Sequence, residues 1–356
     1  MSKLRLAFYA NGGSPTGVTP PDYWGEGEQA GLGGAEAGLV HLTHHLAQRG
    51  HDVEVYNDPK VPDVYGGVRY LPLSEYDLTK SVDALVLFRN PWMGVTRANA
   101  KTRIFWSCDQ QTAGDYGTQV FPWVDHTVCI SPYHLNYHID RYGLDSNTAW
   151  VTNLGANWEE YKTKRKKIKN RLIYCSVPDR GLDILWKAFP YIREQVPDVS
   201  LTITADYRLW GVNYSGDDDH RAMWKTYAEQ NKINYVGAVP HRELAKLQLE
   251  ADICAFPGNY EEMFCIAIAE CQMAGAVPVT STLGAIPNTT GVGVNIADHP
   301  TTPAFRERFV ETIVDLLENR SKLEDMQAKA RKYAIKNYKW EGIAEAWEQK
   351  LEEWIR

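Results

Sequence analysis

Short apolar runs alternate with longer amphipathic stretches along the first part of the chain. Residues 4–10 (LRLAFYA) predict a buried strand, followed by a Gly- and Pro-rich loop that extends to residue 34. Residues 35–49 carry leucines at helical spacing, and Gly50 is predicted to cap that helix. More strands are predicted at residues 52–56, 84–88, 102–106 and 126–130.

The alternation restarts after a basic polar segment at residues 161–170. We interpret this segment as a solvated linker, because the rest of the chain is acidic; a phosphate- or nucleic-acid-binding patch is the alternative. The second series predicts strands at 171–175, 200–204, 234–236, 252–256 and 277–280, helices at 182–195, 219–230 and 242–249, and tail helices at 305–318, 322–336 and 340–354.

Two series of alternating strands and helices are typical of parallel βαβ units. The sequence therefore predicts an α/β protein with two Rossmann-like, doubly wound parallel-sheet domains that face a cleft. The predicted domains are residues 1–160 and 171–337, separated by the linker at 161–170. Residues 338–356 are predicted to form a helix that crosses back to the N-terminal domain.

Composition and charge narrow the class of protein. The 356 residues carry a net charge of −7, which argues against a general binder of nucleic acid or of anionic membranes. The six cysteines show neither a C-x-x-C pair nor a zinc spacing, so we expect reduced thiols and a cytoplasmic location. No apolar run reaches the length of a signal peptide or of a membrane span, so any membrane contact is expected to be peripheral.

The stretch Gly31-Leu-Gly33-Gly34-Ala-Glu36 lies between the first strand and the first helix. Glycines at this position let bare backbone approach an anion, and helix-end N–H groups point toward it. The spacing is neither the G-x-G-x-x-G fingerprint nor a Walker loop. Contact with a phosphate or a sugar and a plain helix-capping turn both remain open.

Arg180-Gly181 is the second candidate. It follows the strand at 171–175, where a guanidinium is well placed to bind a diphosphate through two hydrogen bonds. The alternative is a surface arginine that pairs with Asp179 or Asp183.

The third candidate is EEMFCIAIAECQMAGAVPV, residues 261–279. Glu261 and Glu262 precede an apolar run that is predicted to form a helix from Met263 or Phe264 to Ala274. Glu270 lies about two turns into that helix, although burial of an unpaired charge costs several kcal/mol. Its two oxygens suit a vicinal diol, such as that of a ribose. A partner Lys or Arg elsewhere in the chain is the alternative explanation of Glu270.

Glu262 and Glu270, with seven residues between them, resemble the E-x7-E signature of retaining glycosyltransferases with the two-Rossmann-domain (GT-B) fold, and glycosyltransferase family 4 in particular. The resemblance covers most of the chain. Further segments that carry it are residues 33–36, 50–55, 128–134, 151–155 and 275–279, and Arg180-Gly181 stands where the family usually has Lys-Gly.

The resemblance implies a role for each residue. Glu270 would hold the ribose of a nucleotide sugar, and Glu262 the hydroxyls of the transferred sugar. The backbone amides of Met263, Phe264 and Cys265 would face the diphosphate at a helix N-terminus.

The sequence departs from the family pattern at three places. Met263-Phe264-Cys265 replaces the usual Gly-Phe-Gly, which is expected to reshape the sugar pocket. Cys175 replaces a basic residue, so that a phosphate contact is missing or is supplied elsewhere, with Arg208 as a candidate. Many relatives carry a His near Cys108, and Asp109 is left as a candidate polar group near the reacting carbon; a loop-capping aspartate is the alternative.

Two patterns suggest metal ligands. Asp217-Asp-Asp219 is similar to the D-x-D motif of the other glycosyltransferase fold, but it leads into a helix and is better explained as an acidic N-terminal cap. His41, His44 and His45 lie on an amphipathic helix and are interpreted as surface or core residues. We expect no metal and no cofactor.

These features predict a metal-independent hexosyl-type enzyme that transfers a sugar from a nucleotide-diphosphate donor to an acceptor hydroxyl with retention. The acceptor (glycan, lipid-linked glycan or small molecule) is unknown, and the loop at residues 12–31, with Tyr23 and Trp24, is expected to contact it. The alternatives are a nucleotide-sugar epimerase or a sugar phosphorylase on the same fold, or a degenerate protein that binds a nucleotide sugar without turnover.

Overall fold

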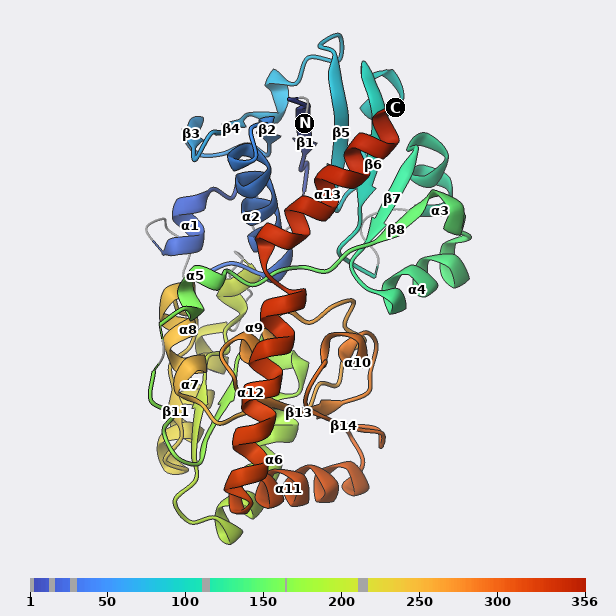
Figure 1. Ribbon diagram of the computed structural model, residues 1–356. Coiled ribbons are helices and arrows are strands. Elements are labelled where there is room, and N and C mark those ends of the chain that lie inside the picture. Colours follow the sequence, from blue (N-terminus) through green and yellow to red (C-terminus); the bar gives the residue numbers. More distant parts are fainter. Residues whose placement is uncertain (1–2, 13–16, 26–30, 111–115, 164, 211–216) are drawn as a thin grey trace. The chain divides into compact units, whose positions relative to one another are not determined.

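The computed structural model describes residues 3–12, 17–25, 31–110, 116–163, 165–210 and 217–356. The chain divides into two compact units (Figure 1). The first contains residues 1–23, 33–154 and 340–356, and the second contains residues 24–32 and 155–339. The basic segment at 161–170 lies within the second unit.

The first unit is built on an eight-stranded sheet in the order β3-β4-β2-β1-β5-β6-β7-β8. All neighbouring strands are parallel except the β3–β4 pair, which is antiparallel. The strands are β1 (Arg5–Tyr9), β2 (Asp52–Tyr56), β3 (Asp63–Tyr65), β4 (Val68–Leu71), β5 (Val82–Phe88), β6 (Ala100–Trp106), β7 (His126–Cys129) and β8 (Ala149–Val151). Every residue of β5 is buried, as expected of a central strand covered on both faces.

Helices of the first unit are α2 (Gly34–Gln48), α3 (Tyr116–Gln119), α4 (Pro132–Tyr142) and α13 (Trp340–Ile355), and the short α1 (Pro20–Trp24) ends where the two units divide. Gly50 follows α2 with a φ of 99°, so the predicted glycine cap is confirmed. The C-terminal helix α13 packs against α2 and carries the buried Glu348, which accepts hydrogen bonds from Arg49 and lies 3.0 Å from the His51 ring.

The second unit has a six-stranded sheet in the order β11-β10-β9-β12-β13-β14, and every neighbouring pair in it is parallel. The strands are β9 (Arg171–Tyr174), β10 (Ser200–Ile203), β11 (Asn234–Tyr235), β12 (Ile253–Phe256), β13 (Val277–Ser281) and β14 (Val294–Ile296). Its helices are α5 (Trp158–Tyr161), α6 (Leu182–Gln195), α7 (Asp217–Gln230), α8 (His241–Glu250), α9 (Ile266–Met273), α10 (Ile286–Thr289), α11 (Pro303–Glu318) and α12 (Arg320–Asn337).

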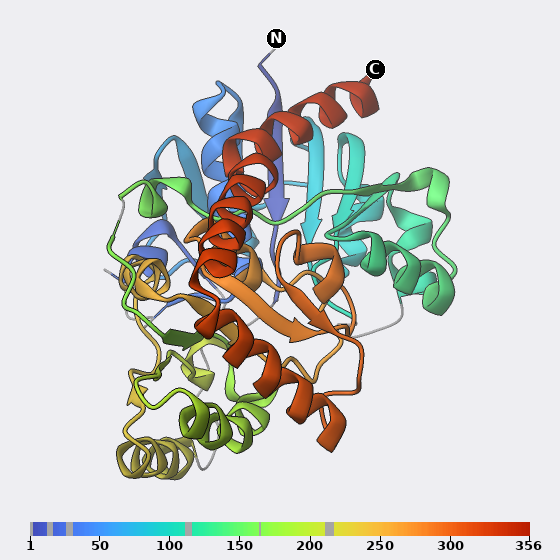
Figure 2. The same ribbon diagram turned by 60° about the horizontal axis from the view of Figure 1, so that its bottom comes forward.

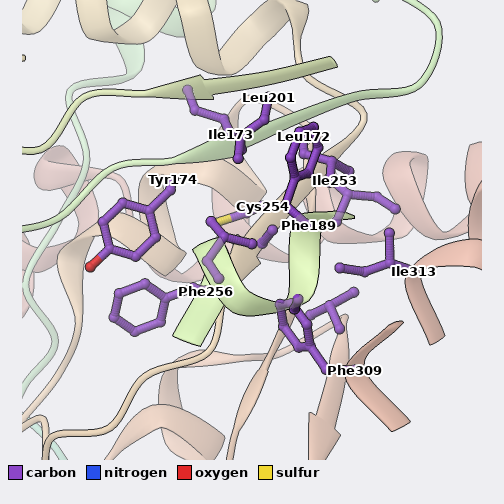
Figure 3. Close-up of a cluster of buried hydrophobic side chains, with 14 of the residues drawn as sticks. Leu172, Ile173, Tyr174, Phe189, Leu201, Ile253, Cys254, Phe256, Phe309 and Ile313 are labelled. Carbon is purple, nitrogen blue, oxygen red and sulfur yellow. The ribbon is translucent and has the colours of Figure 1, made fainter. Parts of the chain in front are cut away.

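Among the helices of the second unit, α6 packs against α11, α9 packs against α8 and α12, and α11 contacts α12. Figure 2 shows α11 and α12 beside the strands of this unit. Its apolar core combines residues of the strands with residues of these helices, among them Leu172, Phe189, Ile253 and Phe309 (Figure 3). Each unit thus forms a Rossmann-like parallel-sheet domain, which confirms the predicted fold class.

No helix in the described ranges combines the length and the apolarity that crossing a bilayer requires.

Candidate functional site

A tight turn after β9 fixes the position of Arg180. Residues Pro178–Arg180 form a single 3-10 turn, and Gly181 continues it with a φ of 105°. A Cβ atom on Gly181 would lie 2.3 Å from the carbonyl oxygen of Pro257, which follows β12. Only glycine meets both conditions, so the turn holds Arg180 against the chain that leaves β12.

Two acids and one aromatic ring surround the Arg180 guanidinium. Its Nη1 donates to Asp179 at 3.0 Å, and its Nε lies 3.6 Å from Glu262 Oε1. The guanidinium carbon lies 3.5 Å from the centre of the Tyr260 ring, within cation–π range. The pairing with Asp179, considered above as an alternative to diphosphate binding, is therefore present together with a contact to Glu262.

Glu262 is held in place through its backbone. Its carbonyl oxygen accepts a hydrogen bond of 2.6 Å from Ala285 N, which joins the loop after β12 to the segment after β13. Burial raises the pKa of Glu262 to about 7, although the nearby Arg180 opposes this shift. The carboxyl group therefore changes its charge near neutral pH.

The raised pKa of Glu262 predicts a pH-dependent stability of the ligand-free protein. An unfolded Glu titrates near pH 4.3, so the contribution of Glu262 is fully present below that pH and is lost as pH rises through about 7. We expect the free energy of unfolding of the wild type, relative to Glu262→Gln, to fall by about 2–3 kcal/mol between pH 5 and pH 8. Urea titrations at both pH values measure it, and parallel changes in the two proteins would contradict it.

The helix that carries Glu270 begins later than the sequence predicts. It spans Ile266–Met273, so Glu270 lies about one turn from its start, and Met263, Phe264 and Cys265 precede it. Cys265 has a φ of 69°, a left-handed conformation that is unfavourable for most residues other than glycine. The left-handed residue directly precedes the first residue of the helix, at the position where the family pattern has its second glycine. Met263, Phe264 and Cys265 are all buried.

Glu270 is buried, with 5% of its surface exposed. Its Oε1 lies 3.6 Å from Nδ1 of His241, the first residue of α8. Burial raises the pKa of Glu270 well above its usual range and lowers the pKa of His241 to about 4. Burial thus disfavours the charged form of both groups.

Sequence reasoning missed His241 and Gln248, both on α8. The Gln248 side chain hydrogen-bonds the Glu270 carboxyl group, and its Oε1 accepts 2.6 Å from the Tyr161 hydroxyl. The available signal was polar residues on the buried face of an amphipathic helix next to the E-x7-E segment. That signal is weak, because helices often bury a satisfied polar side chain.

Asp109 lies in the first unit and belongs to a partly buried ion cluster there. Both of its oxygens accept hydrogen bonds from Arg89, at 2.7 and 2.8 Å, and Arg89 also bonds to Glu36. Glu36 lies in the first turn of α2, which begins at Gly34, and Gly33 is the residue before the helix. Burial raises the pKa of Glu36 despite Arg89. The structure thus joins the first glycine motif to Asp109 through one arginine.

Two further residues singled out in the sequence, Arg208 and His41, contact other side chains. Arg208, considered as a substitute phosphate ligand, donates to the buried Asp206 at 2.9 and 2.7 Å. His41 is buried between the Tyr23 and Trp340 rings. Helix α7 begins at Asp217, but the side chains of Asp217 and Asp218, and parts of the predicted acceptor loop at 12–31, lie outside the described residues.

Among the described residues, two groups of side chains lie close enough together to hold a metal ion. The spacing of these residues along the sequence does not indicate either group. One consists of Cys129, His134 and His138, and the other of Cys175, Cys254 and Cys271. Both nitrogens of His134 are in use, since Nδ1 accepts from Ile130 N at 3.3 Å and Nε2 lies 3.0 Å from the Asp109 carbonyl oxygen.

Comparison with known families gives a match at residues 158–333, to the family described as Glycosyl transferases group 1. A similar curated protein is lipopolysaccharide 1,2-N-acetylglucosaminetransferase of Salmonella typhimurium, 20% identical over 178 residues that cover 50% of this chain and 46% of that protein. The chain thus spans about half the length of the first curated relatives it matches.

Solved structures resemble the whole chain. Sucrose-phosphate synthase from Thermosynechococcus elongatus superposes with a TM-score of 0.73 at 15% identity and covers 99% of each chain. The Anabaena protein HepE, solved in complex with UDP and glucose, gives a TM-score of 0.70 at 14% identity over 98% of this chain and 100% of its own. The chain therefore has the GT-B fold, and its residues 158–333 match the glycosyl transferases group 1 family.

Proposed function

We propose that this protein is a retaining glycosyltransferase that moves a sugar from a nucleotide-diphosphate donor to an acceptor hydroxyl. The observation that carries the proposal is the meeting of Arg180 and Glu262 beyond the carboxyl ends of β9 and β12, with their charged groups 3.6 Å apart. Ligands of open parallel sheets bind at the carboxyl ends of the strands. Both residues belong to the matched family segment.

The reaction needs stabilisation of the diphosphate as it leaves the sugar. In the proposed function the Arg180 guanidinium supplies that stabilisation, because fixed donors aimed at developing charge lower the barrier most. Glu262 holds hydroxyls of the sugar, and Glu270 accepts hydrogen bonds from the ribose diol. An oxygen of the departing phosphate takes the proton of the acceptor hydroxyl, so that the new bond forms on the face that the diphosphate leaves.

Glu270 supports this assignment through its burial. A carboxyl group that is 5% exposed and paired with a neutral imidazole is costly to ionise while the site is empty. The hydroxyls of a ribose would donate hydrogen bonds to it and lower that cost. HepE, a neighbour of the same fold, was solved with UDP-glucose, which makes uridine diphosphate sugars the first donors to test.

A donor screen tests the proposed function. UDP, GDP and ADP and their glucose or N-acetylglucosamine conjugates are added to the protein, and the melting temperature is measured, since a ligand of the native state raises it. The best donor is then incubated with the protein, and release of the nucleoside diphosphate is followed. Binding without release of a diphosphate, with any acceptor offered, would favour the degenerate binding protein, and conversion of the donor sugar without an acceptor would favour the epimerase.

The proposed transfer needs no divalent metal ion, because Arg180 provides the positive charge that such an ion would supply. We expect donor hydrolysis or transfer to continue at an unchanged rate in excess EDTA. The rate is measured with and without the chelator after a short incubation. Loss of activity that Mg²⁺ or Mn²⁺ restores would contradict this expectation.

A further inference from the structure

Three cysteines from distant parts of the second unit converge in its core. Cys175 directly follows β9, Cys254 lies in β12, and Cys271 lies in α9 next to Glu270. Their sulfur atoms all lie within 4.8 Å of one another, and the Cys175 and Cys271 sulfurs are 3.5 Å apart. All three residues are buried, and Figure 3 shows Cys254 among the apolar side chains of the core.

These sulfur–sulfur separations are similar to those between the ligands of a metal–thiolate site. Zinc binds cysteine sulfur at about 2.3 Å, which puts the sulfurs of a tetrahedral or trigonal site about 3.8–4.0 Å apart. The observed separations, all within 4.8 Å, need to change by about 1 Å or less to reach that spacing. Sulfur ligands select soft ions and disfavour Mg²⁺ and Ca²⁺.

An outer hydrogen bond supports one of the three sulfurs. Nε2 of the buried Gln248 donates to Cys175 Sγ at 3.4 Å, and the Tyr161 hydroxyl bonds to the other end of the same amide. Donors of this kind orient a ligand atom and stabilise its negative charge.

The charge of the surroundings favours a divalent ion. Three thiolates and one divalent cation leave one negative charge, and a buried charge needs a partner. Lys167 interacts with Cys271 and donates to the carbonyl oxygens of Ala251 at 2.7 Å and Ala274 at 3.0 Å. Arg320 also pairs with the nearby Asp252 carboxylate, at 2.5 and 2.8 Å, so Lys167 and Arg320 together place two positive groups beside Asp252 and the proposed metal centre.

We propose that Cys175, Cys254 and Cys271 form a binding site for one soft divalent d¹⁰ cation, of which zinc is the common biological example and cadmium a spectroscopic probe. Each thiol releases its proton to solvent as its sulfur binds the ion. The bound ion joins β9 and β12 to α9, the helix that carries Glu270. It stabilises the unit and takes no part in sugar transfer.

The test uses the full chain, reduced and freed of metal. Cd²⁺ is titrated in, and the ultraviolet charge-transfer band of the cadmium–thiolate bond is recorded. We expect saturation at one Cd²⁺ per chain, slower alkylation of three of the six cysteines than in the metal-free protein, and a raised melting temperature. Zn²⁺ should displace Cd²⁺, whereas Mg²⁺ should not.

Variants locate the site. Cys254→Ala and Cys271→Ala should each lose the one-equivalent band, and Gln248→Leu should weaken Cd²⁺ binding by about 10-fold or more. Cys108→Ala removes a thiol of the first unit and should retain the band. Absence of a band in the reduced wild type, or a band that persists in both cluster variants, would overturn the proposal without bearing on sugar transfer. The alkylation rates of the wild type, measured with and without Cd²⁺, test the proposal even where a variant does not fold.

Discussion

Glu270→Gln is expected to weaken binding of the nucleotide-sugar donor by ~1.5–3 kcal/mol, or about 10- to 100-fold in the dissociation constant. The amide keeps the shape of the side chain but replaces one acceptor oxygen with a donor and removes the charge that a ribose diol would satisfy. Fold stability should stay the same or rise, because the buried carboxyl group is costly at its site. The loss should therefore appear in binding and not in folding.

Isothermal titration with the nucleoside diphosphate measures this loss, and a melting curve measures stability. Glu261→Gln is the matched control, since it makes the same chemical change at an exposed position nine residues earlier. That control should bind like the wild type. An unchanged dissociation constant for Glu270→Gln would mean that the Glu270–His241 pair serves only the structure.

Arg180→Ala is expected to lower turnover by about 10²–10³-fold while donor affinity falls much less. Negative charge on the diphosphate grows as the glycosidic bond breaks, so a guanidinium aimed at it stabilises the transition state more than the bound donor. Glu262→Ala should behave differently, because it removes only the contact with the sugar. Affinity for the bare nucleoside diphosphate should then survive, and discrimination between donor sugars should relax.

The comparison needs kcat and the dissociation constants of both the nucleoside diphosphate and the intact donor in each variant. Lys187→Ala, an exposed position on α6, is the control and should match the wild type. Because Arg180 and Glu262 lie 3.6 Å apart, the double variant is also informative, and its effects should not add. Equal weakening of both ligands by Glu262→Ala would show that Glu262 does not contact the sugar.

The sequence by itself determined the two series of strands and the fold class. Runs such as residues 84–88 are apolar throughout, and a strand buried on both faces of a parallel sheet has that composition. The strands β3, β4, β8 and β14 escaped prediction, because they lie at or next to a sheet edge and are only partly buried, so they lack the continuous apolar run of a central strand. The start of α9 was predicted two or three residues too early, since the left-handed backbone of Cys265 has no local signal in a non-glycine residue.

Only the tertiary structure decided which side chains meet. Arg180 contacts Glu262, Asp109 contacts Arg89, and Glu270 lies beside His241 because the order of the strands and the turns after them bring these segments together. The same holds for the three cysteines: Cys175 directly follows β9, Cys254 lies in the neighbouring β12, and Cys271 lies in α9. The hydrophobic period is a local property that determines whether a segment forms a helix or a strand. The contacts between these side chains depend instead on the order of the strands and on tight turns such as that at Gly181. The spacing of residues along the chain therefore does not predict which side chains meet.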